Sequence, residues 1–471
     1  MKGWIGDCQR HHRLCKGPQQ VGGPKRLLQC LSDGSVRLVE TKSCTQRCEY
    51  IALSYCWGDG TAVKKTMKKT VGSHHRGIPN EDLPPLFQEV AALARGLNIA
   101  YFWIDALCII QDSLDDIEEE IMQMSEIFRG ALVVVVAASG ESPLDSLLRV
   151  KPQSDQSHTW RTASWIRYEG KNLDVKFRKR ANGSHFSTNA TEFTPIGERA
   201  WCFQEKLVAS RYLVFHEDEV IWECQSCCRC ECGREQEDLS DANPWDRNAV
   251  QPMEPYRKML LPLAEHEHFQ RDGSLKYFAD AEAAHSFWER AVHNFSPRKM
   301  TFETDRLPAI SAVASIVAEA TGDRYLAGLW ENNLLAGLGW FLSVSPESAR
   351  RPRPTQTYIA PTWSWVSLPT GVWYRSNRTP HRRDAGLDAS VYNAWTALGG
   401  PNPFGRVSDG AIVLSGLHCD AELTISEHGF AKLDFGHGGV QTVSLGEVRL
   451  QALDFIPVES DPNVDRLGGN P

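Results

Sequence analysis

The chain has 471 residues, of which 42% are hydrophobic and 23% are charged. This length accommodates two or three domains of about 150 residues each, and the apolar fraction is enough to build real cores. A net charge of −8 excludes the overall basic signature of nucleic-acid-binding proteins, so we expect no nucleic-acid partner.

The compartment follows from the N-terminus and the cysteines. The opening residues, "MKGWIGDCQRHHRLC", lack the continuous apolar segment of a secretory signal. The longest apolar run, 131–138, is far shorter than the roughly 20 residues that span a bilayer. We therefore expect a cytoplasmic protein with no membrane span. Its 14 Cys are expected to be reduced thiols or metal ligands rather than a disulfide framework.

The first elements of the chain alternate between strands and helices. Residues 1–49 form a polar lead-in that carries Cys and His, with a hairpin expected around Asp33 and Gly34. "YIALSY" resembles a buried strand, and it ends on Trp, Gly and Asp. A helix is expected over "LPPLFQEVAALARGLN", because two prolines open it and a glycine stands near its end. "IAYFWIDALCII" then predicts a strand that is buried on both faces.

The clearest helix is expected in "QDSLDDIEEEIMQMSEIFRGA". Ser113 and Asp116 are arranged like a capping box, and an apolar stripe follows at helical spacing. "ALVVVVAAS" predicts another buried strand. Strands that alternate with helices in this way predict an α/β fold, with a doubly wound, mostly parallel sheet and helices on both of its faces.

The composition of the chain after residue 139 predicts several further segments. We expect a loop-rich insertion over 140–197, then a helix at 201–209 and a hairpin made of "RYLVF" and "VIWEC". Residues 233–357 predict a mainly helical extension, and 358–471 a β-rich region. In "PTWSWVS", Trp363 and Trp365 alternate, which predicts one strand face packed in the core. The chain opens almost on "WIGDC" and ends without a clear final strand, as a shortened gene product would.

Two strand ends carry the polar residues that attract attention. Ligands of an open α/β sheet bind beyond the carboxyl ends of its strands, and "SYCWG" and "DALCIIQD" stand at two such ends. The candidate ligand-binding residues there are Ser54, Tyr55, Trp57, Gly58, Asp105, Gln111 and Asp112. Alternatively, Tyr55 and Trp57 pack the top of the sheet and Gly58 forms the turn. Asp105 is equally explained as a cap or as an ion pair with an arginine such as Arg199.

Four ordered blocks of the chain resemble the fungal heterokaryon incompatibility (HET) domain. They are "YIALSYCWG", "LPPLFQEVAALARGLNIAYFWIDALCIIQD", "MSEIFRGALVVVVAAS" and "RAWCFQEKLVASRYLVF". Flanking segments such as "WIGDCQRHHRLC" and "PTWSWVS" extend the resemblance over most of residues 4–367, and we assign the domain itself to 50–232. The resemblance implies a role in fungal non-self recognition, in which HET domains trigger programmed cell death.

The resemblance also implies a distant relation to the TIR domain, a doubly wound α/β module of innate immunity. Some TIR domains cleave NAD at the nicotinamide–ribose bond, and others act only as adaptors. "WCFQE" is similar to the segment that carries the catalytic glutamate of the NAD-cleaving members, which implies a catalytic Glu205 and a ligand-facing Trp201. One carboxylate suits this reaction because it stabilises an oxocarbenium-like ribosyl centre. The alternative is a structural salt bridge from Glu205 to Arg199 or Arg211.

Two functions therefore remain open. The first is an effector that hydrolyses NAD as a substrate and needs no cofactor, and the second is a non-enzymatic, self-associating signalling module. Either one implies a homo-oligomer on activation. The sequence has no nucleotide-binding P-loop and no ankyrin or WD repeats, so the implied partner is a separate sensor or an allelic incompatibility protein.

The cysteine-rich segment "CQSCCRCEC" has two interpretations, a zinc site or free thiols. Its C-x-x-C spacing is that of a zinc half-site, which would use Cys224, Cys227, Cys230 and Cys232. No second C-x-x-C follows, so free thiols and no metal are favoured. Cys8, His11, His12 and Cys15 could supply distant ligands, but nothing in the sequence places them nearby. A nucleophilic Cys56 or Cys108 lacks a local partner signature.

Overall fold

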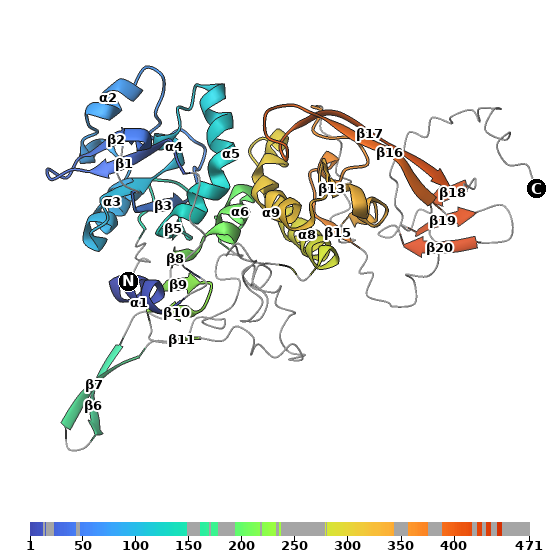
Figure 1. Ribbon diagram of the computed structural model, residues 1–471. Helices are drawn as coiled ribbons and strands as arrows, with labels where there is room; N and C mark the ends of the chain where they lie inside the picture. Colours follow the sequence, from blue (N-terminus) through green and yellow to red (C-terminus); the bar gives the residue numbers. More distant parts are fainter. Residues whose placement is uncertain are drawn as a thin grey trace, which may run out of the picture.

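A sheet of nine strands organises the N-terminal half of the molecule (Figure 1). The computed structural model describes residues 1–12, 15, 23–43, 48–147, 161–168, 171–177, 194–216, 219–231, 235–236, 278, 280–342, 357–374, 389–416, 422–425, 430–434 and 440–444. The strand order is β11-β10-β9-β8-β5-β3-β4-β1-β2. Four neighbouring strands in the middle are parallel, and the strands on either side of them are antiparallel.

The parallel centre comprises β3 (Tyr50–Ser54), β4 (Tyr101–Trp103), β5 (Val133–Ala137) and β8 (Arg211–Phe215). Every residue of β3, β5 and β8 is buried, as continuous apolar runs predict for strands covered on both faces. The spatial order β4-β3-β5-β8 places the first strand between the second and the third. This is a doubly wound order, and the chain reverses direction across the sheet between β3 and β5.

Hairpins extend the sheet at both edges, so the whole sheet is mixed rather than mostly parallel. On one side lie β1 (Arg26–Cys30) and β2 (Val36–Glu40), and on the other lie β9 (Val220–Cys224), β10 (Cys228–Cys230) and β11 (Glu235–Gln236). Short turns join β1 to β2 and β9 to β10, and short turns can connect only antiparallel neighbours. The β1–β2 hairpin turns at Gly34, with φ of 89°, as predicted around Asp33 and Gly34.

Helices cover both faces of this sheet. Figure 1 shows α3 (Pro85–Leu97) on one side and α5 (Leu114–Gly130) with α6 (Ala200–Val208) on the other. The predicted helices are thus confirmed. The shorter helices of this half are α1 (Lys2–His11), α2 (Val71–Arg76) and α4 (Asp105–Cys108).

The start of α5 differs from the predicted capping box. Ser113 is the N-cap residue, but its side chain accepts no capping hydrogen bond. Asp116 instead points into the protein, where it pairs with Arg26 and accepts a 2.8 Å hydrogen bond from the backbone N–H of Ile110. Arg26 and Asp116 are 5% and 8% exposed, and this ion pair ties α5 to β1.

The insertion at 140–197 contains a hairpin that the sequence analysis did not predict. Strands β6 (Arg161–Tyr168) and β7 (Lys171–Phe177) pair antiparallel. β7 does alternate, with Leu173, Val175 and Phe177 at every second position, but β6 does not, and the polar residues common around both strands favoured a loop region over a hairpin.

The second half is helical and then strand-rich, as predicted. Its helices are α8 (Ala281–Phe295), α9 (Ser311–Thr321) and α10 (Leu334–Gly337). Its strands are β12 (Tyr325–Leu326), β13 (Leu329–Trp330), β14 (Trp340–Leu342), β15 (Val372–Tyr374), β16 (Ala389–Leu398), β17 (Val407–Gly416), β18 (Glu422–Ile425), β19 (Phe430–Asp434) and β20 (Val440–Ser444). The domain boundaries themselves stay predictions.

The tryptophans of "PTWSWVS" lie in the core, but not on a strand. Trp363 and Trp365 are 6% and 0% exposed, which confirms the expected packing role. Trp365 opens a short 3-10 helix, and its indole N–H donates to the carbonyl of Gly328 at 2.9 Å. The predicted strand is therefore wrong, because the segment turns into a 3-10 helix at Trp365, whose indole finds a buried carbonyl acceptor.

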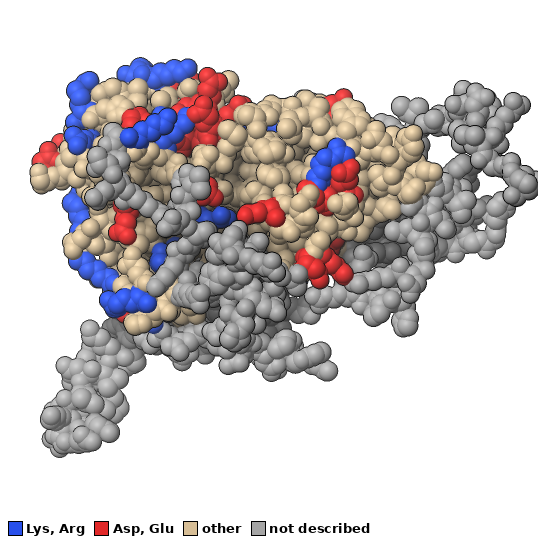
Figure 2. Space-filling view, in the orientation of Figure 1, with Lys and Arg blue, Asp and Glu red and all other residues tan. Residues whose placement is uncertain are grey.

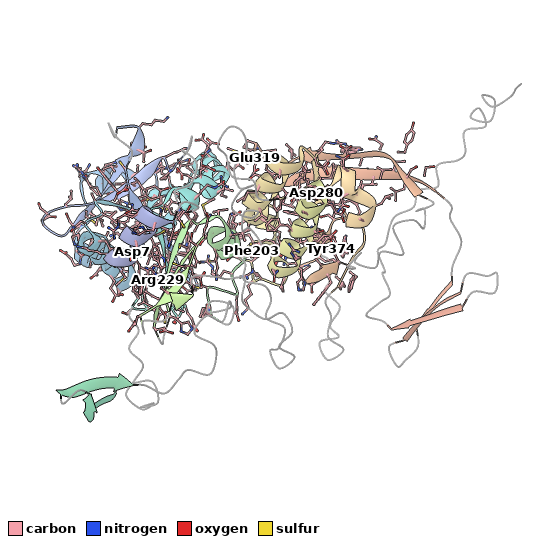
Figure 3. All side chains as sticks on the ribbon, turned by 60° about the horizontal axis from the view of Figure 1, so that its bottom comes forward. Asp7, Phe203, Arg229, Asp280, Glu319 and Tyr374 are labelled. Carbon is pink, nitrogen blue, oxygen red and sulfur yellow. The ribbon has the colours of Figure 1, made fainter. Side chains whose placement is uncertain are left out.

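Helix α6 joins the sheet to this second half. Phe203 packs edge-on against Phe295 of α8, with ring centroids 5.8 Å apart, and Figure 3 shows Phe203 between the sheet and the later helices. Gln204 accepts a 3.2 Å hydrogen bond from the backbone N–H of Ala312 in α9. Helix α6 is thus held by contacts with α8 and α9 on the side that faces away from the sheet.

Charged side chains are unevenly distributed over the visible face of the molecule. Figure 2 shows acidic and basic side chains interspersed over the sheet-containing half of the visible face, while the other half is mostly uncharged. Among the described residues, no helix combines the length and the apolar character needed to cross a membrane.

The buried pair of Arg26 and Asp116 gives a first prediction. Asp116→Ala should lower the free energy of unfolding by about 3–5 kcal/mol, because it leaves the Arg26 guanidinium buried without its counter-charge. Urea denaturation measures this change. Asp115→Ala is the matched control, since Asp115 is exposed on the same turn and should change stability little. Equal effects of the two variants would contradict the assignment.

Candidate functional site

The candidate site lies where β3 ends. Ser54 is the last residue of β3, and its hydroxyl donates a 2.5 Å hydrogen bond to Oε2 of Glu205 on α6. The two residues are 151 positions apart in the chain and are 1% and 8% exposed. The first and the last of the four sequence blocks therefore meet at the carboxyl end of the parallel strands, next to the place where the strand order reverses.

Tyr55 forms the inner wall of this site. Its ring packs edge-on against Phe87, with centroids 5.3 Å apart, and it is 3% exposed. The expected packing role of Tyr55 thus accounts for its ring. Its buried hydroxyl has no hydrogen-bond partner within the described part of the chain, although burial and the nearby Asp105 carboxylate raise its pKa well above the usual value. Arg199 donates from its guanidinium to the backbone carbonyl of Tyr55.

Trp57 and Asp105 form the outer edge. The indole N–H of Trp57 donates to Oδ2 of Asp105 at 2.8 Å, and Oδ1 of Asp105 accepts from the backbone N–H of Ala106 at 2.6 Å. Asp105 is the first residue of α4, whose N-cap position is Ile104 and which has no side-chain cap. The expected capping role is therefore not found: one oxygen binds the adjacent backbone N–H and the other orients Trp57. Trp57 and Asp105 are both partly exposed.

Two further predicted residues support the backbone of this edge. The side-chain amide of Gln111 donates to the carbonyls of Asp105 and Ile109 at 3.0 and 3.2 Å. Asp112 accepts a 2.7 Å hydrogen bond from the backbone N–H of Lys68. Both side chains thus bind backbone groups of loops, and neither hydrogen-bonds to Ser54 or Glu205.

Gly58 is required by the turn itself. Its φ is 64°, a conformation that favours glycine. A Cβ atom at this position would stand 3.0 Å from Cβ of Ser142. The expectation that Gly58 forms the turn is therefore supported, and the loop after β3 is held against the start of the 140–197 segment.

Burial perturbs the two carboxyl groups of the site. Desolvation raises the pKa of Glu205 to about 7, against the opposing effects of the Ser54 hydrogen bond and the Arg199 charge. Desolvation also raises the pKa of Asp105, while Arg199 and Trp57 oppose the shift. Near neutral pH the Glu205 carboxyl therefore changes its charge, as catalytic carboxyl groups often do.

The structural alternative for Glu205 was a salt bridge to Arg199 or Arg211. Within the described residues Glu205 makes no ion pair with Arg199 or Arg211. Arg211 lies elsewhere, donating from Nε to Sγ of Cys8 at 3.2 Å. Arg199 is bound to the Tyr55 carbonyl. Trp201 is partly buried and packs against the core.

Arg199 and Cys202 are members of the site that the sequence analysis did not name as site residues. Arg199 lies close enough to both carboxyl groups to influence their pKa values, and the thiol of Cys202 contacts Glu205. In "RAWCFQE" the helical spacing of three residues places Cys202 on the same face of α6 as Glu205. Arg199 is the extended N-cap residue of α6, so no helical spacing places it there.

The cysteine-rich segment is not arranged as one zinc site. Cys224 and Cys227 lie close, with their Sγ atoms 3.6 Å apart. Cys230 is disulfide-bonded, and Cys232 lies outside the described residues. Ten of the described cysteines are free, including Cys56 and Cys108, and burial raises the pKa of Cys56 to about 11, which disfavours a nucleophilic thiolate.

The raised pKa of Glu205 predicts a pH-dependent stability. Because the folded pKa lies above the ordinary value of 4.5, ionisation opposes folding: the penalty is absent below about pH 4.5 and complete above about pH 7. Glu205→Gln should therefore raise the free energy of unfolding by up to about 3 kcal/mol at pH 8.5, and by little at pH 4.5.

Denaturation in urea at the two pH values measures this difference. Glu319→Gln is the control, since Glu319 is exposed on α9 and its replacement should have a small effect at either pH. A gain for Glu205→Gln that is the same at both pH values would contradict a buried carboxyl with a raised pKa.

Comparison with known proteins identifies the domain that contains this site. No curated protein and no solved structure matches the chain. Residues 50–205 match the family model described as heterokaryon incompatibility protein (HET). The matched segment begins at the first residue of β3 and ends at Glu205, so the two residues joined by the Ser54–Glu205 hydrogen bond both lie within it. Residues 50–205 are therefore similar to the HET domain, and this segment contains both residues of the candidate site.

Proposed function

We propose that this chain is an effector of fungal non-self recognition whose HET domain hydrolyses NAD at the nicotinamide–ribose bond, with Glu205 as the catalytic carboxylate. The HET domain indicates a role in heterokaryon incompatibility. The observation that carries the enzymatic part is the buried Glu205, oriented by Ser54 at the carboxyl ends of the parallel strands. The distant likeness of "WCFQE" to NAD-cleaving TIR domains supports the same reaction.

The chemistry fits a single carboxylate. In this reaction the bond between ribose C1′ and the nicotinamide nitrogen breaks, and nicotinamide leaves as a neutral molecule with the bonding electron pair. Positive charge develops on the ribosyl centre, where a fixed carboxylate stabilises it. Water then adds to C1′ and releases a proton, which leaves ADP-ribose. The leaving group needs no proton, so Glu205 acts as the charge-stabilising group.

The neighbouring residues suit the other parts of the substrate. Trp57 is partly exposed, and its indole is oriented by Asp105; such a ring can stack on a flat heterocycle. The guanidinium of Arg199 supplies a positive charge beside two carboxyl groups, as recognition of a pyrophosphate requires. Because Ser54 and Glu205 are almost fully buried, the loop after β3 has to move for a ribose to reach them.

The decisive experiment measures nicotinamide release from NAD by the purified protein, both dilute and fused to an oligomerising tag that enforces clustering. Glu205→Gln keeps the shape of the side chain and removes its charge, so it should reduce release by about 10²-fold or more. The matched control is Glu120→Gln. Glu120 is also a buried glutamate, 0% exposed on α5, and desolvation raises its pKa to about 7 as well.

The possible outcomes test two things separately: whether the protein hydrolyses NAD, and whether Glu205 is the catalytic residue. Release by the wild type and by Glu120→Gln, together with loss in Glu205→Gln, supports the proposal. Equal release by both variants would remove Glu205 from the mechanism. No release by the clustered wild type would exclude NAD hydrolysis itself.

The rate should also depend on pH. Charge stabilisation requires the ionised form of Glu205, whose pKa is raised to about 7. We therefore expect the rate of nicotinamide release to rise with pH, with a midpoint near 7, and to level off above about pH 8. A profile that is flat between about pH 5.5 and 8.5 would contradict this role.

The alternative function is a non-enzymatic module that signals by self-association. One observation favours it: strands β16 and β17 expose several large apolar side chains. They are Tyr392, Trp395, Leu398, Val413 and Leu414, which are 82%, 40%, 48%, 39% and 39% exposed. Self-association is compatible with either function, so only the assay of nicotinamide release distinguishes them.

A further inference from the structure

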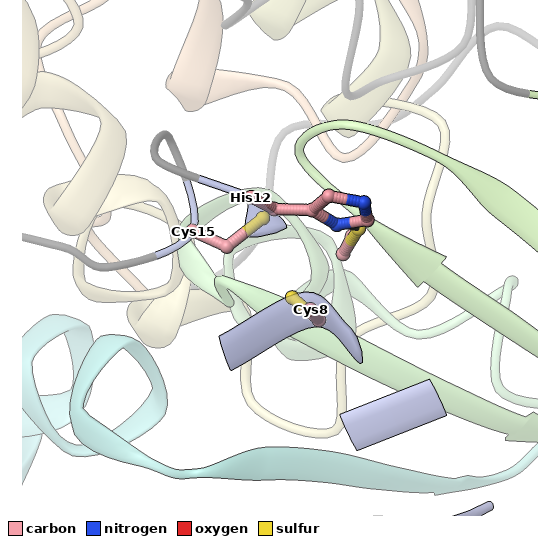
Figure 4. A group of neighbouring side chains, drawn as sticks. Cys8, His12 and Cys15 are labelled. Atoms are coloured by element: carbon pink, nitrogen blue, oxygen red, sulfur yellow. Dashed lines mark hydrogen bonds between the residues drawn. The ribbon is translucent and has the colours of Figure 1, made fainter. Parts of the chain in front are cut away.

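A cluster of potential metal ligands lies far from Glu205, where the N-terminal helix meets the edge of the sheet. Cys8 lies in the last turns of α1, His12 directly follows this helix, and Cys15 comes next. The fourth member, Cys224, ends β9. Figure 4 shows the side chains of Cys8, His12 and Cys15 converging on one point.

The local backbone explains why these side chains converge. Helix α1 ends at His11, and His12 takes an extended conformation, so the chain turns back on itself. The N–H of Cys15 then donates to the carbonyl of His12 at 3.2 Å. The spacing C-x-x-x-H-x-x-C therefore directs three ligands, two thiols and one imidazole, from a helix end and the following turn toward the same side.

Contacts on either side of the cluster hold α1 against the sheet. The ring of Trp4 lies 6.5 Å from that of Trp222, centroid to centroid. The guanidinium of Arg229 lies 3.2 Å from Oδ2 of Asp7, and Figure 3 shows these two residues next to each other. The meeting of α1 with β9 and β10 thus does not depend on the cysteines alone.

The distances fit one tetrahedral ion. The Sγ atoms of the three cysteines and a ring nitrogen of His12 all lie within 4.8 Å of one another. Nδ1 of His12 is 3.2 Å from Sγ of Cys224. At ordinary Zn–S and Zn–N bond lengths, ligand atoms of a tetrahedral site are about 3.5–3.8 Å apart. Side-chain adjustments of about 1 Å would therefore close the cluster around zinc.

Burial argues against a chance meeting of surface residues. Cys8, Cys15 and Cys224 are 0%, 1% and 1% exposed, while His12 is partly exposed. All three cysteines are free thiols, although they lie near enough to form disulfides. Buried single cysteines often behave as small apolar residues. Three of them around an imidazole nitrogen form instead the donor set of a structural zinc site.

The surroundings provide the charge and the hydrogen bonds that such a site needs. Three thiolates, one neutral imidazole and Zn²⁺ carry a net charge of −1. Arg211 is only 8% exposed and donates from Nε to Sγ of Cys8 at 3.2 Å, and from NH2 to the carbonyl of Cys15 at 2.8 Å. The backbone N–H of Cys227 donates to Sγ of Cys224 at 3.3 Å. Such second contacts orient ligands and balance their charge.

We propose that Cys8, His12, Cys15 and Cys224 bind one structural zinc ion that fastens the N-terminal helix to the β9–β10 edge of the sheet. Four protein ligands leave no open position, so the site is structural rather than catalytic. Three thiolates and an imidazole in a tetrahedral arrangement favour zinc over magnesium or calcium, which prefer oxygen ligands. His12 and Cys224 are 212 positions apart, so the ion would close a long loop of the chain.

The first test uses the full chain purified under reducing conditions, with metal content measured by mass spectrometry. We expect about one zinc per chain, and X-ray absorption at the zinc edge should show three sulfur neighbours at about 2.3 Å and one nitrogen at about 2.0–2.1 Å. This readout needs no variant. A chain that binds no zinc after reconstitution, or a zinc with mainly oxygen neighbours, would overturn the proposal.

Variants then test each ligand. Cys8→Ser, Cys15→Ser and Cys224→Ser should each lower the zinc content from about one to near zero per chain. Cys227→Ser is the matched control on the same hairpin, because it keeps the backbone N–H that contacts Cys224, and it should retain zinc. Loss of zinc from Cys227→Ser alone would overturn the assigned ligand set.

His12 offers a test that separates binding from misfolding. His12→Ala should lose zinc, whereas His12→Cys should retain it, because a fourth thiolate is also a good zinc ligand. Cobalt in place of zinc should give the intense visible bands of a tetrahedral ion in the wild type, with a changed spectrum in His12→Cys. Identical cobalt spectra in the two proteins would exclude His12 as a ligand.

Discussion

The hydrogen bond between Ser54 and Glu205 is the constraint on which the candidate site depends. It joins the end of β3 to α6 across 151 positions of the chain, so the site exists only when the parallel centre of the sheet is complete. Helix α6 is itself held by the sheet on one side and by α8 and α9 on the other, through Phe203 and Gln204. Any movement that exposes Glu205 therefore has to come from the loops around α6 rather than from the helix.

Burial of Glu205 lowers the stability of the folded chain near neutral pH, and a residue with a purely structural role would not have to be ionisable. A glutamate whose pKa is raised to about 7 by desolvation opposes folding when it ionises, and glutamine would make the same hydrogen bond with Ser54 without that cost. Asp116 shows the opposite case: Arg26 neutralises its charge, and the pair joins two elements. A buried carboxyl group whose pKa stays raised despite the nearby charge of Arg199 is typical of sites that give up stability for function.

The sequence determines the local elements well because they depend on local patterns. Continuous apolar runs predicted β3 and β5, and the Asp33-Gly34 turn predicted the hairpin of β1 and β2. The short strands β10 and β11, the β6–β7 hairpin and the 3-10 turn at Trp365 were not predicted, since they depend on partners rather than on periodicity. At the site, the strand-end rule identified Ser54 and Asp105, and family resemblance identified Glu205. Helical spacing could have placed Cys202 beside Glu205. Only three-dimensional contacts place Arg199 there, because its guanidinium binds the carbonyl of Tyr55, 144 positions away in the chain.

The cysteine cluster and the candidate site are connected through one short segment of chain. Glu205 lies on α6, and Arg211, which contacts both Cys8 and Cys15, begins the strand that follows. Ala209 and Ser210, between them, are buried, so this turn has little freedom to absorb a displacement. An ion bound to Cys8 and Cys15 would fix the carbonyl that Arg211 binds, and through Arg211 the start of β8. Its influence on Glu205 would therefore be mechanical, transmitted by the α6–β8 turn, rather than electrostatic.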